Sequence, residues 1–203
     1  MEIEQIKNIK LNFILASPRT GSTLLSSMLN AHPNVISTSE ETFTYSLYPK
    51  YKGVTNWTSE IIQQFCYDFY LFSEGKFEIQ FGTKKDLMDL LEKHKQNLTY
   101  EADINLVHLC FFTSKDKSNI TTLVDKHLVF HFILEKVALM YPESKFIILH
   151  RDPRDNALVK RRMFERQNKK TQSYYQLSCS WKYVYGRLLK LKDKIGKHRF
   201  LEI

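Results

Sequence analysis

A polar segment near the N-terminus holds the residue types that bind an anion. The apolar run Phe13-Ile-Leu-Ala-Ser17 is typical of a buried strand, and Pro18-Arg-Thr-Gly-Ser-Thr23 follows it. A helical pattern begins near Ser22, and the first backbone N–H groups of a helix lack intrahelical partners and lie at its positive dipole end. We therefore expect these amides and hydroxyls, with the guanidinium of Arg19, to hold a phosphate or a sulfate.

The same segment resembles a P-loop but lacks the lysine of that motif. In the pattern G-x-x-x-x-G-K-[ST] the lysine contacts the β- and γ-phosphates, and the hydroxyl binds Mg²⁺. Here Arg19 precedes Gly21, and Ser22 stands where the lysine would be. The sequence therefore predicts a loop for an anion other than a magnesium-bound triphosphate, and it predicts no metal site.

Two further groups of charged residues follow apolar runs. Asp125-Lys126-His127 follows the β-branched stretch 119–124, and Arg151-Asp-Pro153 follows the strong strand pattern 145–150. Ligands of parallel sheets bind beyond the carboxyl ends of the strands. We therefore expect the three polar segments to form one site.

The order of strand and helix patterns predicts the fold class. We expect an α/β protein with a P-loop NTPase-like three-layer sandwich, in which a central, mostly parallel sheet is flanked by helices. Strands are predicted at 11–17, 35–37, 119–124, 145–150 and 199–203. Helices are predicted from near Ser22, from Thr58 or Ser59 to Phe72, from Thr83, over 128–140 and in a long pattern after Pro153. Residues 45–57 are predicted to be a loop, and residues 1–203 to be a single domain.

The charge is unevenly distributed along the 203 residues. The formal net charge is +8, but residues 145–203 hold 16 Lys and Arg against 5 Asp and Glu. A basic third of this kind suits an anionic ligand, a nucleic acid or a solvated helix face. The alternation of aromatic and basic residues that is typical of RNA-binding modules is missing, so we expect no nucleic-acid partner.

The cysteines and the apolar runs bear on location. Cys66, Cys110 and Cys179 are odd in number and widely spaced, which favours neither a disulfide framework nor a metal site. The N-terminus lacks the basic and apolar regions of a signal peptide, and no apolar run reaches the ~18 residues of a membrane span. We therefore expect a cytoplasmic protein without a transmembrane segment.

Taken together, these motifs resemble the sulfotransferases that use 3′-phosphoadenosine 5′-phosphosulfate (PAPS). Residues 18–33 are similar to the 5′-phosphosulfate loop and first helix of that family, and residues 146–155 to its 3′-phosphate strand and turn. Asp125-Lys126 with Tyr141-Pro142 resembles the intervening segment of bacterial and tyrosylprotein sulfotransferases. The resemblance covers about residues 11–203 and is weak over 45–115. It implies sulfuryl transfer from PAPS, without a metal, to the hydroxyl or amine of a small molecule, glycan or peptide.

The resemblance also implies roles for individual residues. The implied cofactor-binding residues are Arg19, Thr20, Gly21, Ser22, Thr23, Arg151 and Arg162. Arg19 and Lys126 are expected to stabilise charge on the transferring group and the leaving phosphate. Glu41 of Glu40-Glu41-Thr42 resembles the base of tyrosylprotein sulfotransferases, with Glu40 as an alternative, and His127 is a third candidate by analogy with the cytosolic branch.

Two features depart from the family pattern. Val159 occupies the position of a serine that lies eight residues after the 3′-phosphate arginine, so either Lys160, Arg161 and Arg162 compensate by charge or the pocket is weak. The chain ends within its last predicted strand, where the family continues. We therefore expect the domain to be C-terminally incomplete relative to the family, with poor solubility or weak activity of residues 1–203.

Other functions stay open at this point. The rivals are a P-loop kinase or other phosphotransferase, and a non-catalytic or degenerate nucleotide-binding P-loop protein. Trp181 and Tyr185 have the ring types that stack on adenine, but their helical spacing favours the core. The acceptor pocket is expected within residues 45–119, where no motif identifies the acceptor, and no oligomeric state is predicted.

Overall fold

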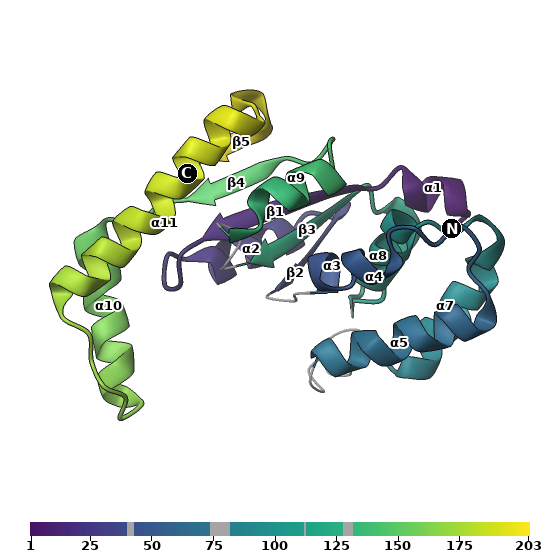
Figure 1. The fold of residues 1–203 in the computed structure, drawn as a ribbon, viewed down its shortest axis with the longest axis horizontal. Helices are drawn as coiled ribbons and strands as arrows, with labels where there is room; N and C mark the ends of the chain where they lie inside the picture. Colours follow the sequence, from purple (N-terminus) through teal and green to yellow (C-terminus); the bar gives the residue numbers. More distant parts are fainter. Residues whose placement is uncertain (40–42, 74–81, 112, 128–131) are drawn as a thin grey trace. The chain divides into compact units, whose positions relative to one another are not determined.

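A five-stranded parallel sheet forms the centre of the described structure, in the order β2-β3-β1-β4-β5. The computed structural model describes residues 1–39, 43–73, 82–111, 113–127 and 132–203 (Figure 1). The strands are β1 (Lys10–Ala16), β2 (Val35–Ser39), β3 (Thr122–His127), β4 (Phe146–Leu149) and β5 (Phe200–Glu202). Helices flank the sheet, so the predicted fold class, a P-loop-like α/β sandwich, is confirmed.

One helix precedes β1, and the other described helices lie between successive strands of the chain. They are α1 (Ile3–Lys7), α2 (Ser22–Asn30), α3 (Phe43–Ser46), α4 (Tyr48–Tyr51), α5 (Ser59–Ser73), α7 (Lys84–His94), α8 (Tyr100–Leu109), α9 (Leu134–Met140), α10 (Pro153–Arg166) and α11 (Tyr174–Ile195). Short 3₁₀ turns are η1 (Lys95–Asn97), η2 (Lys117–Asn119) and η4 (Lys197–Arg199). The contacts divide the chain into two compact units. Unit 1 comprises residues 1–11 and 28–125, and unit 2 comprises residues 12–27 and 126–203.

The pairing of β1 with β4 organises unit 2. The two strands are parallel, and Phe13 lies opposite Phe146 and Ala16 opposite Leu149. Both strands are largely buried, as expected for a parallel strand that is covered on both faces. The next residues along the chain begin the two polar segments 17–23 and 150–154, so both segments leave the sheet at the same edge, side by side.

The two long helices of unit 2 begin at well-formed caps. The Asp152 side chain accepts a hydrogen bond from the backbone of Arg154, and Pro153 opens α10. Ser173 and Gln176 form a capping box at the start of α11. The long helical pattern after Pro153 is therefore two helices, separated by residues 167–173.

Three sequence-based expectations need correction. Residues 45–57 contain the end of the short helix α3 and all of α4, and both helices are too short to show a helical period in the sequence. The strand predicted at 119–124 begins at Thr122 and continues through His127. Of the helix predicted over 128–140, residues 128–131 lie outside the described part. Residues 132 and 133 precede α9, which covers Leu134–Met140, and Leu139 on this helix is 82% exposed.

Unit 1 contains a buried carboxyl group on α8. Asp103 is completely buried, and neither of its oxygens has a hydrogen-bond partner among the described residues. Burial raises the pKa of Asp103 well above its usual range, because the charged form cannot be solvated. The folded protein therefore binds a proton here that the unfolded chain releases above about pH 4.

We expect Asp103→Asn to remove a pH-dependent loss of stability. Because the folded-state pKa is raised, the free energy of unfolding falls as pH rises from about 4 toward that pKa, by up to about 1.4 kcal/mol per pH unit. The asparagine does not titrate, so the difference in stability between the variant and the wild type should grow in favour of the variant over this range. Urea unfolding between pH 4 and 7 measures it. The exposed Asp89→Asn is the matched control, and an equal slope in all three proteins would contradict the expectation.

Candidate functional site

The loop between β1 and α2 has an unusual backbone conformation. Arg19 has φ 68° and Gly21 has φ 99°, both in the left-handed region. A residue other than glycine is uncommon there, and such positions cost on the order of 1–3 kcal/mol when the surroundings enforce them. Inside the loop, the Thr20 hydroxyl donates to the Ser17 carbonyl oxygen at 2.8 Å. The backbone of Leu25 donates to the Gly21 carbonyl oxygen and continues the loop into α2.

Side chains from the segment after β4 hold this loop in place. Arg151 Nη1 donates to the Arg19 carbonyl oxygen at 3.0 Å, and Asn156 Nδ2 donates to the Pro18 carbonyl oxygen at 2.9 Å. Lys160 Nζ donates to the Ser17 hydroxyl oxygen at 2.9 Å. Residues 17–19 are thus bound by three donors from residues 151–160, all within unit 2. The sequence predicted that these two segments meet, and this geometry agrees.

The end of β3 reaches the same loop. Lys126 Nζ lies 3.2 Å from the Thr23 hydroxyl oxygen and donates to it. Lys126 is 2% exposed, so this ammonium group lies inside the protein rather than in solvent. The predicted meeting of the segments at 17–23, 126 and 151 therefore agrees with the contacts of unit 2.

Other predicted site residues lie elsewhere. The Arg19 guanidinium contacts α10, where Nε and Nη2 lie 3.2 and 2.9 Å from the Met163 sulfur. Arg162 is exposed and has no hydrogen bond or ion pair in the described part of the chain. His127 is buried at the end of β3. Glu40 and Glu41 lie outside the described residues, so the choice of base stays a prediction.

Sequence reasoning missed Asn156 as a residue that contacts the loop, and it named Lys160 only as a compensating charge. Both side chains are buried, and burial lowers the pKa of Lys160. They are four residues apart on α10 and therefore share one helix face, whereas Arg162 is two residues further on and faces another direction. Helical spacing counted from Pro153 is the signal that would have identified this face.

The two aromatic residues of α11 behave mainly as core. The Tyr185 hydroxyl donates to the Leu149 carbonyl oxygen at 2.5 Å, and its ring stacks on His150 with centroids 4.8 Å apart. Trp181 packs on Tyr185 at 4.6 Å and is half-buried. The preference for core over adenine stacking agrees with the burial of Tyr185.

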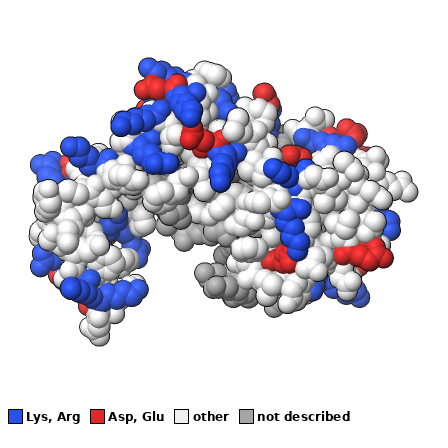
Figure 2. Space-filling model, in the orientation of Figure 1, with Lys and Arg blue, Asp and Glu red and all other residues white. Residues whose placement is uncertain are grey.

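The surroundings of the loop are cationic. Lys126, Arg151 and Lys160 donate to it, whereas the nearby carboxylate of Asp152 is paired with Arg154. Hydrogen bonds from the Arg154 side chain and backbone lower the pKa of Asp152 to about 2. In Figure 2 the surface of α10 and α11 carries many more Lys and Arg than Asp and Glu. Such a field favours an anionic ligand.

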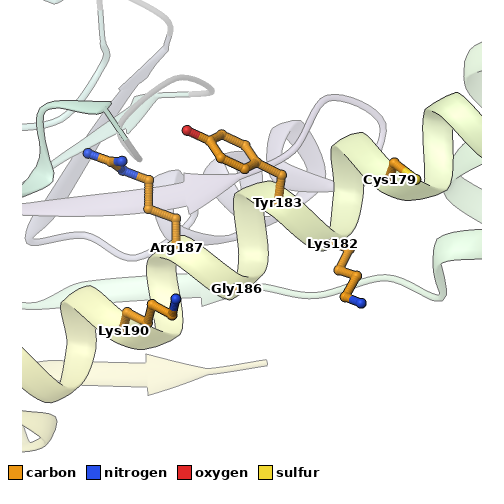
Figure 3. A pocket seen from close by; sticks show the side chains of 6 residues that line it. All are labelled: Cys179, Lys182, Tyr183, Gly186, Arg187 and Lys190. Atoms are coloured by element: carbon orange, nitrogen blue, oxygen red, sulfur yellow. The ribbon is translucent and has the colours of Figure 1, made fainter.

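A separate groove lies along α11. It has a volume of about 550 Å³ and is lined by Cys179, Lys182, Tyr183, Gly186, Arg187 and Lys190. Tyr183 and Arg187 extend from one side of the helix and Lys182 from the other (Figure 3).

The described residues contain neither a metal-binding cluster nor a membrane-spanning helix. No group of three or more His, Cys, Asp and Glu side chains in the described ranges is placed to hold a metal ion. None of the described helices combines the length and the apolarity needed to cross a membrane.

A model of the sulfotransferase family matches residues 12–203. The chain belongs to the sulfotransferase family. This sulfotransferase is similar in fold to the sulfotransferase domain from the curacin biosynthetic pathway, with 23% identity, a TM-score of 0.58, and coverage of 96% of this chain and 66% of that one. It is also similar to sulfotransferase STF9 from Mycobacterium avium, with 14% identity, a TM-score of 0.51, and coverage of 97% and 59%.

The two structural likenesses support a conclusion about the fold. At such identities they show the fold alone, and the sulfotransferase chain spans less than two thirds of either solved protein. No curated protein matches the chain. These likenesses therefore establish neither an activity nor a substrate of this chain.

We expect Asn156→Ala to loosen the loop and destabilise unit 2. The variant leaves the Pro18 carbonyl oxygen without its buried donor, which costs about 1–3 kcal/mol. Chemical denaturation measures the loss, and Gln172→Ala, an exposed amide before α11, is the control. If both variants unfold at the wild-type denaturant concentration, Asn156 does not support the loop.

Proposed function

We propose that this sulfotransferase transfers a sulfuryl group from PAPS to an acceptor hydroxyl or amine, with the donor bound between the loop at 17–23 and Arg151. The observation that carries the proposal is the 3.0 Å hydrogen bond from Arg151 Nη1 to the Arg19 carbonyl oxygen. It joins the ends of β1 and β4, the two segments that resemble the 5′- and 3′-phosphate sites of the family. One adenosine bisphosphate is short enough to contact both.

The 5′-phosphosulfate end is assigned to the loop. The backbone amides and hydroxyls of Gly21, Ser22 and Thr23 lie at the start of α2, where the helix dipole favours a negative charge. The Arg19 side chain reaches the sulfate in this proposal by leaving the Met163 sulfur, a weak acceptor that an anionic oxygen readily replaces.

The proposed reaction is an in-line displacement at sulfur. The acceptor oxygen or nitrogen forms a bond to sulfur while the bond from sulfur to the 5′-phosphate oxygen breaks, and adenosine 3′,5′-bisphosphate leaves. Negative charge builds on that phosphate oxygen, and Lys126, which already contacts Thr23, is the group assigned to stabilise it. The acceptor proton passes to Glu41, with Glu40 and His127 as the alternatives; the burial of His127 favours the glutamates.

The 3′-phosphate end is assigned to Arg151 and Arg162. Val159 cannot supply the hydroxyl that the family has at this position. Of the basic residues that follow it, Lys160 contacts the loop through Ser17, so it adds positive charge beneath the site. Arg162 is exposed, and in this proposal it binds the 3′-phosphate from the solvent side.

We expect the bisphosphate product to stabilise the protein selectively. A ligand at about 100 times its Kd adds about 2.7 kcal/mol to the free energy of unfolding. In a chain of this size that raises Tm by roughly 5–10 °C. Thermal unfolding with PAPS, adenosine 3′,5′-bisphosphate, AMP and magnesium ATP measures the preference. A larger shift with magnesium ATP would favour a kinase, and no shift with any of the four would refute the proposed donor site.

Activity is measured with ³⁵S-labelled PAPS and a panel of acceptor probes. The panel contains 2-naphthol, a tyrosine-containing peptide and glucosamine, which represent the small-molecule, peptide and glycan classes. Labelled product in the presence of EDTA supports sulfuryl transfer without a metal. Product that appears only with added Mg²⁺ would contradict the mechanism above.

We expect Arg151→Gln to abolish the preference for the 3′-phosphate. Hydrogen bonds to a charged group contribute about 1.5–3 kcal/mol, which corresponds to about 10- to 150-fold in affinity. Calorimetric titration should show this loss for adenosine 3′,5′-bisphosphate and a much smaller one for AMP. Arg154→Gln, on the exposed side of the same turn, is the control. An equal loss for both nucleotides would show that Arg151 shapes the loop without binding the 3′-phosphate.

A further inference from the structure

A buried lysine of α10 has no counter-ion among the described residues. Lys160 is 9% exposed, and its Nζ donates one hydrogen bond within the described ranges, at 2.9 Å to the Ser17 hydroxyl oxygen. Burial lowers the pKa of Lys160, and no described carboxylate opposes this shift. Taking a cation out of water without a charged partner costs free energy. The contacts within the described chain do not offset this cost.

Ser17, the partner of Lys160, is the residue from which the loop starts. It follows β1 directly and is 2% exposed. Its carbonyl oxygen accepts a hydrogen bond from the Thr20 hydroxyl at 2.8 Å. Burial raises the pKa of Tyr185, and the hydrogen bond that its hydroxyl receives from the Ser17 backbone opposes this rise. The base of the loop is therefore bound by α10 through Lys160 and by α11 through Tyr185.

The ammonium group of Lys160 still has hydrogen-bond donors and charge to offer a ligand. A lysine ammonium has three N–H donors, and Ser17 accepts from one of them. A hydroxyl partner carries no formal charge, so it does not neutralise the cation. In the protein interior the attraction between this cation and an anion is stronger than in water, because the local dielectric is lower. An anion on the loop at 17–23 would supply the missing counter-ion.

The loop itself lacks the cation of the P-loop pattern. In that pattern a lysine directly follows the second glycine and contacts the phosphates. Here Ser22 follows Gly21, so the loop has no lysine of its own at this position. Lys160 approaches the same loop at its other end, from a helix that begins 130 residues later in the chain than Thr23. The loop that lacks a lysine and the lysine that lacks a counter-ion are thus in direct contact.

We propose that Lys160 is a specificity-determining residue of this sulfotransferase: from beneath the loop, its buried ammonium group supplies the positive charge that the loop lacks and selects nucleotides that carry a 5′-phosphate. The inference rests on the proposed function, because the 5′ end of the donor is assigned to the loop that Lys160 contacts. Lys160 acts through Ser17 and through its charge, so the proposal requires no direct contact with the nucleotide.

Two adenosine monophosphates and three variants test the proposal. AMP carries its only phosphate at the 5′ position, and adenosine 3′-monophosphate carries it at the 3′ position. Lys160→Met removes the charge and keeps an unbranched chain, whereas Ser17→Ala removes the hydrogen-bond partner and keeps the charge. Lys169→Met, which removes an exposed cation between α10 and α11, is the control for net charge. Calorimetric titration gives the Kd values, and urea unfolding without ligand gives the stability.

We expect Lys160→Met to weaken AMP binding by about 10- to 100-fold, because a buried charge that faces the 5′-phosphate is lost. The Kd of adenosine 3′-monophosphate should change by less than about threefold. Ser17→Ala should weaken AMP binding by only about threefold, since the ammonium group remains. Without ligand, Lys160→Met should unfold at the wild-type urea concentration or above it, because it removes a buried cation without a counter-ion. Lys169→Met should change neither affinity nor stability.

Three results would overturn the proposal. An unchanged Kd of AMP in Lys160→Met, or an equal loss for both monophosphates, would show that Lys160 does not serve the 5′ end. If Lys160→Met unfolds at lower urea concentration and Ser17→Ala weakens AMP binding to the same extent, Lys160 only supports the loop.

The failure of the proposed function has a different signature. A wild-type protein that binds neither monophosphate nor adenosine 3′,5′-bisphosphate lacks the proposed donor site, and the role of Lys160 fails with it. Wild-type binding of AMP that Lys160→Met retains in full refutes the role of Lys160 and leaves the donor site standing.

Discussion

The parallel pairing of β1 with β4 is the constraint on which the site depends. Backbone hydrogen bonds fix Ala16 opposite Leu149, and neighbouring strands of a sheet lie about 4.8 Å apart. The segments that follow β1 and β4 therefore leave the sheet at the same level along the strands, with a fixed distance between them. This is why one side chain, Arg151, reaches the backbone of the first loop at Arg19 without any rearrangement of either strand.

The donors from the β4 and α10 segment also orient the loop. Arg151 and Asn156 bind the carbonyl oxygens of Arg19 and Pro18, and the described residues contain no cis peptide bond. In a trans peptide the N–H group points opposite to the carbonyl of the same unit. The N–H groups that follow these two carbonyls therefore point away from the Arg151 and Asn156 side chains. Fixing them before a ligand arrives reduces the ordering cost of binding an anion, and the left-handed backbone of Arg19 is maintained by the same contacts.

The sequence predicted the parts of the site that follow from local pattern. An apolar run, a Gly-containing turn and a helix start are adjacent in the chain, so the loop at 17–23 was recognisable without coordinates. Asn156 was not, because its contact to Pro18 depends on which face of α10 turns toward β1. The helices α3 and α4 were missed because four residues show no period, and the extent of β3 was underestimated because Asp125 and Lys126 are charged. Their burial is explained by Thr44 and Thr23, whose positions more than 80 residues away in the chain no local pattern reveals.

Two ways of burying charge in this sulfotransferase have opposite consequences. Lys126 and Lys160 are buried at the loop, where their ammonium groups donate to the hydroxyl oxygens of Thr23 and Ser17. A hydroxyl partner does not neutralise a cation, and a low local dielectric strengthens the attraction between a buried cation and a bound anion. Asp103 is buried in unit 1 without any hydrogen-bond partner among the described residues, and this burial raises its pKa because it disfavours the charged form. The hydroxyl partners thus preserve the positive charge of the two lysines, whereas the burial of Asp103 favours its neutral form.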